Sequence, residues 1–124
     1  MKKTLQNILV LGAKSDIAAA TARLYAEQSC ALTLAARETD SLEKIKEDLL
    51  IRGAVKVELV EVNLESVKSI KTFLKNLDPL PDLVLCAVGY LGEQSRTEKD
   101  FKEMERVIKA NLTGPAMIFE KLAQ

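Results

Sequence analysis

A short turn near the start of the chain has residues suited to binding a phosphate. The segment GAKSDI, Gly12 to Ile17, follows the apolar run Asn7–Leu11 and precedes a helix-like pattern. Glycine lets a ligand approach the backbone closely, and a helix N-terminus offers free N–H groups with a partial positive charge. A Walker A loop is excluded, because Ala13 separates Gly12 from the following lysine. One glycine is also what any short strand-to-helix turn needs, so this segment alone favours a purely structural turn.

Polar or small residues also follow the other apolar runs of the chain. Arg37 follows the second run, Asn63 follows the third, and Cys86 to Gly89 end the fourth. The charge of Arg37 could pair with a phosphate, or it could simply be solvated at a strand end. Asn63 could hydrogen-bond a ligand or serve as a helix cap or turn residue. Cys86 stands in an apolar run of a chain without histidine, which favours a buried structural thiol over a nucleophile.

The elements that must position these residues alternate along the chain. Strands are predicted at Asn7–Leu11, Ala31–Ala36, Val55–Val62 and Asp82–Gly89. Helices are predicted at Ser15–Gln28, Asp40–Gly53, Ser66–Leu77 and, for the most part, Thr97–Gln124, where Pro115 predicts a kink or a break. This alternation predicts right-handed βαβ units and a parallel sheet. Such sheets bind ligands beyond the carboxyl ends of their strands, so the candidate residues should meet there.

Composition restricts the classes of function. The chain has 124 residues, which suits a single domain over residues 1–124, and its 48% apolar and 29% charged residues are typical of soluble proteins. Lys plus Arg and Asp plus Glu each total 18, so no net charge favours nucleic acid or a membrane surface. The absence of His argues against a metal site and removes the commonest general base. Cys30 and Cys86 are interpreted as buried, reduced thiols, and no run is long enough to span a membrane, so we expect a cytoplasmic location.

In their order along the chain, these segments resemble the N-terminal half of the short-chain dehydrogenase/reductase family. The family opens with Thr-Gly-x-x-x-Gly-x-Gly, and here LGAKSDIA keeps the first glycine as Gly12 and the usual isoleucine as Ile17. Asp16 replaces the middle glycine and would repel a pyrophosphate unless it points away. Ala18 replaces the last glycine and adds only a methyl group. The resemblance implies an α/β, Rossmann-type doubly wound parallel sheet that is incomplete here, with strand order 3-2-1-4.

The resemblance also implies a dinucleotide, NADP(H) in preference to NAD(H). NAD-binding members have an acidic residue at the position of Ala36, whereas Ala36 followed by Arg37 is similar to the NADP-preferring pattern, with Lys14 as a second positive charge. Asn63 and Leu64 would contact the adenine, and Cys86–Gly89 would form the floor of the ribose site. The full set of implied cofactor-binding residues is Gly12, Lys14, Ser15, Asp16, Ile17, Arg37, Asn63, Leu64, Cys86, Ala87, Val88 and Gly89.

The segment DFKEMERVIKANLTGP matches the family most closely, with Asp100, Phe101, Asn111 and Gly114 at the family spacing. Asn111 would have a supporting catalytic role, because in the family this residue supports a proton relay. The family's catalytic Ser and Tyr-x-x-x-Lys are not in this chain. The resemblance therefore implies the NADP(H)-binding part of an oxidoreductase that transfers hydride between a nicotinamide and a carbonyl or alcohol, inactive as this chain alone.

The alternative interpretation is a non-catalytic, truncated Rossmann module that acts by association or has no cofactor function. The fourth strand would be an open edge of the sheet, and apolar residues occur around more than one face of the last helix. Either feature could support a homo-oligomer, and the small-molecule dinucleotide is the other expected partner.

Overall fold

The computed structural model describes residues 6–87 and 100–123. Four parallel strands, β1 (Asn7–Leu11), β2 (Ala31–Ala36), β3 (Lys56–Glu61) and β4 (Leu83–Cys86), form one sheet in the order β3-β2-β1-β4. The α-helices are α1 (Asp16–Glu27), α2 (Glu43–Arg52), α3 (Val67–Asn76), α5 (Phe101–Ile108) and α6 (Gly114–Leu122). A 3-10 turn, η1 (Asp40–Leu42), precedes α2, and a π-helical turn, η2 (Lys109–Thr113), joins α5 to α6. The predicted α/β class and strand order are confirmed.

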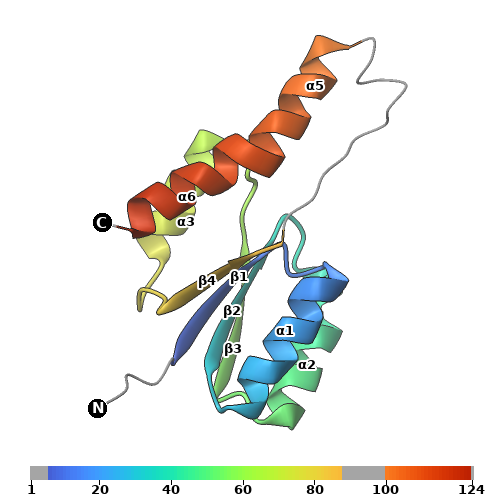
Figure 1. Ribbon diagram of the computed structural model, residues 1–124, viewed down its shortest axis with the longest axis vertical. Coiled ribbons are helices and arrows are strands. Elements are labelled where there is room, and N and C mark those ends of the chain that lie inside the picture. Colours follow the sequence, from blue (N-terminus) through green and yellow to red (C-terminus); the bar gives the residue numbers. More distant parts are fainter. Residues whose placement is uncertain (1–5, 88–99, 124) are drawn as a thin grey trace.

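The sheet lies between two layers of helices. Helices α1 and α2 cover one face, and α3 and α6 cover the other, while α5 extends past the carboxyl ends of the strands (Figure 1). Strand β1 lies between β2 and β4, and its side chains alternate between the two cores. Ile8 and Val10 pack with α1 and α2, whereas Leu9 and Leu11 pack with α3 and α6. This two-sided burial explains why the strand is a continuous apolar run.

The register of the strands brings their carboxyl ends to one edge of the sheet. Leu11, the last residue of β1, is paired with Ala35 of β2 and with Cys86 of β4. Strand β3 continues the alignment, since Ala36 is paired with Glu61. The residues that follow these strands therefore start from the same edge, as the sequence predicted.

Helix α1 buries a stripe of alanines rather than its bulkiest apolar residues. The bulky residues Ile17 and Leu24 are 72% and 60% exposed, whereas the buried residues are Ala18, Ala22 and Ala26. Alanines at every fourth position form one small-residue stripe along the helix. The stripe lets the backbone of α1 lie close to the sheet, and the larger side chains point outward.

The observed bounds of the strands and helices differ from the predicted bounds by a few residues, and the burial of one cysteine differs from the prediction. Strands β3 and β4 are each shorter than predicted, and Val88, Gly89 and 97–99 lie outside the described residues. The helical segment continues through Pro115 without a break, and its irregularity is the π-helical turn η2, which ends at Thr113. Cys30 is buried as expected, but Cys86 is only half-buried. No helix in the described part of the chain is long and apolar enough to cross a membrane.

Candidate functional site

A cleft of about 420 Å³ lies at the carboxyl ends of β1, β2 and β3. The predicted site residues that line it are Gly12, Lys14, Ser15, Arg37, Asn63, Leu64, Ala87 and Asn111. Three predicted residues, Asp16, Ile17 and Cys86, are not part of its lining, and Val88 and Gly89 lie outside the described residues. The structure thus brings together predicted residues from five separate segments.

The turn after β1 is built around Gly12. Its φ of 75° is in the left-handed region that glycine adopts readily, and its N–H donates to the carbonyl of Ala35 at 3.2 Å. Ser15 is the N-cap of α1, and its hydroxyl accepts from the N–H of Ala18 at 3.5 Å. Asp16 is exposed in the first helical turn, where a carboxylate complements the helix dipole. Asp16 does not line the cleft, so its carboxylate does not stand in the place expected for a pyrophosphate.

The loop after β3 is held by its own side chains. The side-chain oxygen of Asn63 accepts from the N–H of Glu65 at 3.0 Å, and the N–H of Asn63 donates to the hydroxyl of Ser69 at 2.9 Å. Ser66 caps α3 by accepting from the N–H of Ser69 at 3.2 Å. Asn63 therefore lines the cleft, and its side-chain oxygen has the turn-forming role that the sequence analysis gave as one of two alternatives.

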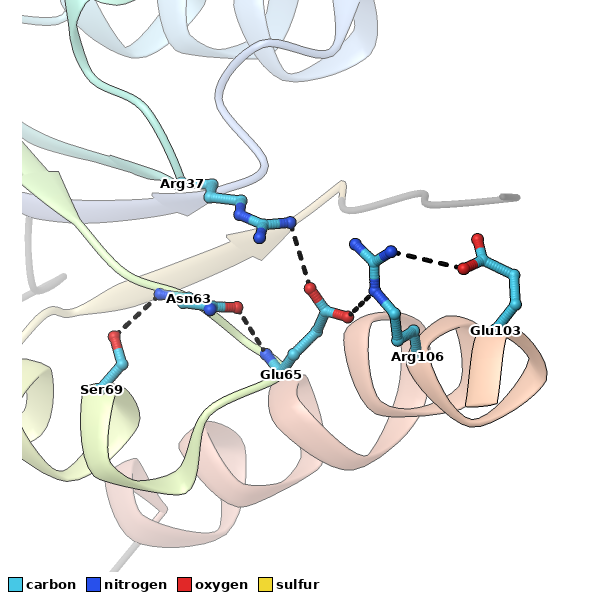
Figure 2. A network of polar contacts seen from close by, with 6 residues as sticks. All are labelled: Arg37, Asn63, Glu65, Ser69, Glu103 and Arg106. Atoms are coloured by element: carbon cyan, nitrogen blue, oxygen red, sulfur yellow. Dashed lines mark hydrogen bonds and ion pairs between the residues drawn. The ribbon is translucent and has the colours of Figure 1, made fainter. Parts of the chain in front are cut away.

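Arg37 is engaged in an ion-pair cluster that the sequence did not predict (Figure 2). Its Nη1 lies 3.1 Å from Oε2 of Glu65, and the other oxygen of that carboxylate accepts from Nε of Arg106 at 2.7 Å. Arg106 also pairs with the buried Glu103 at 3.3 Å. The side chain of Glu65 is only 15% exposed, whereas that of Arg37 is 60% exposed. Glu65 lines the cleft, and its place just beyond β3 was the available signal for it.

Asn111 reaches the cleft because α6 packs tightly against the loop after β3. A Cβ added to Gly114 would overlap the carbonyl oxygen of Leu64 and lie 2.8 Å from its Cβ. Only a glycine permits this approach, and the π-helical turn η2 immediately before it carries Ala110 and Asn111 to the cleft wall. π-Helical turns occur frequently at functional sites. In the parts of the chain that the structure describes, no cluster of three or more His, Cys, Asp or Glu side chains could hold a metal.

A parallel sheet in this order, with a glycine turn between β1 and α1 and a cleft beyond the strand ends, is the arrangement of dinucleotide-binding Rossmann folds. The profile of the short chain dehydrogenase family matches residues 6–124. The chain belongs to this family.

Two relatives are similar to most of this chain. The chain is 35% identical over 111 residues to glycine betaine reductase of Emericella nidulans, covering 86% of this chain and 8% of that protein. It is 36% identical over 115 residues to an uncharacterized oxidoreductase of Streptomyces coelicolor, covering 88% of this chain and 44% of that protein. The chain thus spans less than half the length of these relatives.

Two solved structures share the fold. One is a short-chain dehydrogenase from Sphingobium yanoikuyae in complex with NADPH, with a TM-score of 0.83 and 22% identity, covering 96% of this chain and 48% of that one. The other is an NAD+-bound xylitol dehydrogenase, with a TM-score of 0.77 and 23% identity, covering 95% of this chain and 46% of that one.

Proposed function

We propose that this chain binds NADP(H) in the cleft beyond β1, β2 and β3, as the cofactor-binding half of a family oxidoreductase. The observation that carries the proposal is that the Gly12 turn and Arg37 line one cleft from neighbouring strands. The turn and the N-terminus of α1 would hold the pyrophosphate. Arg37, with Lys14 on the same cleft, would hold the 2′-phosphate, because a guanidinium presents several donors to phosphate oxygens.

The cleft suits the adenosine end of such a cofactor. Its volume of about 420 Å³ is within the range of roughly 300–1,000 Å³ that is usual for small-molecule sites. Its walls combine apolar residues, among them Val62 and Leu64, with a few polar groups, which is the composition expected around an adenine and its ribose. The two solved structures bind NADPH and NAD+ respectively, so the preference for NADP(H) rests on Arg37 rather than on the fold.

The bound cofactor would supply hydride exchange at its nicotinamide, and this chain would hold and orient it. Asn111 lies on the cleft wall, where its side chain would support a proton relay. The chain contains no Tyr-x-x-x-Lys, because Tyr25 is followed four residues later by Ser29 and Tyr90 by Gln94. We therefore infer that this chain binds the cofactor without turning over a substrate on its own.

Calorimetric titration with NADPH and NADH tests the proposal. Arg37→Ala should weaken NADPH binding by about tenfold or more, since a hydrogen bond to a charged group contributes roughly 1.5–3 kcal/mol. NADH binding should change little. Arg23→Ala is the matched control, because Arg23 carries the same charge on α1, outside the cleft lining. Absence of binding of either cofactor to the wild-type chain, combined with self-association, would favour the non-catalytic alternative instead.

A further inference from the structure

We propose that Glu65 sets the discrimination between phosphorylated and unphosphorylated ribose, because its carboxylate competes with the 2′-phosphate for Arg37. This inference rests on the proposed function and concerns the same cleft. The carboxylate already accepts from Nη1 of Arg37 at 3.1 Å (Figure 2), and it thus occupies one of the guanidinium donors that a phosphate could use. The carboxylate of Glu65 is thus paired with the guanidinium of Arg37 that is expected to recognise the 2′-phosphate.

The four described side chains of the cluster carry equal positive and negative charge. Arg37 and Arg106 contribute two positive charges, and Glu65 and Glu103 contribute two negative charges. Arg37 therefore does not present an uncompensated charge to an incoming phosphate. Because the side chain of Glu65 is only 15% exposed, water screens its charge less than it would at the surface.

Glu65 is held in place from the other side by Arg106. Its second oxygen accepts from Nε of Arg106 at 2.7 Å, the shortest contact of the cluster, and Arg106 is in turn paired with Glu103 on the same helix. Because Arg106 holds the Glu65 carboxylate in place, the carboxylate does not move away when a phosphate approaches Arg37. Arg37 still has further N–H donors for the phosphate, but the ligand would bind them beside a fixed negative charge.

An unphosphorylated ribose has the opposite relation to Glu65. Ribose hydroxyl groups donate hydrogen bonds, and carboxylates accept them in dinucleotide-binding folds. Arg37 thus favours the phosphorylated ribose while Glu65 favours the unphosphorylated one. We expect the wild-type chain to bind 2′,5′-ADP and 5′-AMP with affinities that differ by less than about tenfold.

Glu65→Gln is the decisive variant, because it removes the charge and retains the size and an acceptor oxygen for Arg37. Calorimetric titration should show 2′,5′-ADP binding about tenfold tighter than in the wild type, with 5′-AMP unchanged or weaker. Glu61→Gln is the matched control, since Glu61 is an exposed acid of β3 outside the cleft lining and its change alters net charge equally. Glu65→Ala provides a second variant and should change the ratio of the two affinities in the same direction.

If the affinity for 2′,5′-ADP relative to 5′-AMP is unchanged in the Glu65 variants, the inference is overturned. If that relative affinity falls, the inference is also wrong, and Glu65 instead orients Arg37 for the phosphate. The same titrations separate this result from failure of the proposed function. A wild-type chain that binds neither nucleotide, or an Arg37→Ala variant that keeps full affinity for 2′,5′-ADP, contradicts the proposed function. Normal wild-type binding and loss in Arg37→Ala, without a gain in Glu65→Gln, contradict only the role of Glu65.

Discussion

Replacing Gly114 by alanine tests the contact that brings α6 to the cleft. The added Cβ would overlap the carbonyl oxygen of Leu64 and lie 2.8 Å from its Cβ and 2.9 Å from the carbonyl oxygen of Lys109. Two of these three atoms belong to the backbone, so no side-chain rotation relieves them. Helix α6 and the loop after β3 must separate by about 1 Å, and such overpacking costs about 1–3 kcal/mol.

Part of this cost is offset within the helix. Alanine is favoured over glycine in a helix interior by roughly 0.5–1 kcal/mol. We therefore expect a net destabilisation of about 1–2 kcal/mol, which lowers the Tm of a domain of this size by roughly 3–8 °C. Urea unfolding followed by circular dichroism measures the free energy, and a thermal scan measures the Tm.

Thr113→Ala is the matched control for this change. Thr113 is exposed and adjacent in sequence, so the same alanine there should alter stability by less than about 0.5 kcal/mol. The Gly114 variant should also bind NADPH more weakly, because the loop that must move carries Leu64 and Asn63 on the cleft wall. A Gly114→Ala protein with an unfolding midpoint equal to or above that of the wild type would refute the close packing described here.

The remaining predictions concern three single residues away from the cofactor titrations. Gly53→Ala should cost about 1–2 kcal/mol in urea unfolding, because φ is 122° at this helix end, and an unchanged midpoint would contradict it. Ser66→Ala should cost about 1 kcal/mol through loss of the N-cap of α3, measured by the same assay, and a smaller cost than at an exposed serine would argue against the cap. Burial, and then the charge of Asp82, raise the pKa of the Cys30 thiol, so iodoacetamide should modify Cys30 more slowly than the half-buried Cys86. The free energy of unfolding should correspondingly fall as pH rises above the ordinary thiol pKa, since the unfolded chain loses this proton first. Equal rates in peptide mass spectrometry would contradict the difference in reactivity.

The order of elements was predictable because each strand is a distinct apolar run bounded by turn and cap residues. Continuous runs such as Asn7–Leu11 occur where a parallel strand is covered on both faces, and the structure has β1 in that position. The rotation of α1 was not predictable in the same way. A pattern that weights large apolar residues identifies Ile17 and Leu24, but close packing on the sheet selected the alanine stripe instead.

The candidate site was predictable to the extent that it depends on strand ends. Gly12, Arg37 and Asn63 each follow a strand, and the shared edge of a parallel sheet brings them together. The ion-pair cluster around Arg37 was not predictable, because Glu65 is 28 positions from Arg37 and 41 positions from Arg106, and the second contact depends on how α5 is placed. The outward position of Asp16 likewise follows from the helix phase set by the cap at Ser15.

The π-helical turn η2 couples the length of the chain between α5 and α6 to two distant contacts. Each residue added to or removed from a helix rotates everything beyond it by about 100°. Arg106, before the turn, pairs with Glu65, while Ile118, after it, is fully buried in the core on the face of α3. The π-helical turn holds one residue more than an α-helical turn without such a rotation, so both side chains stay aimed at their partners. In the α-helical parts that flank this turn, the number of residues between Arg106 and Ile118 is therefore constrained independently of their identity.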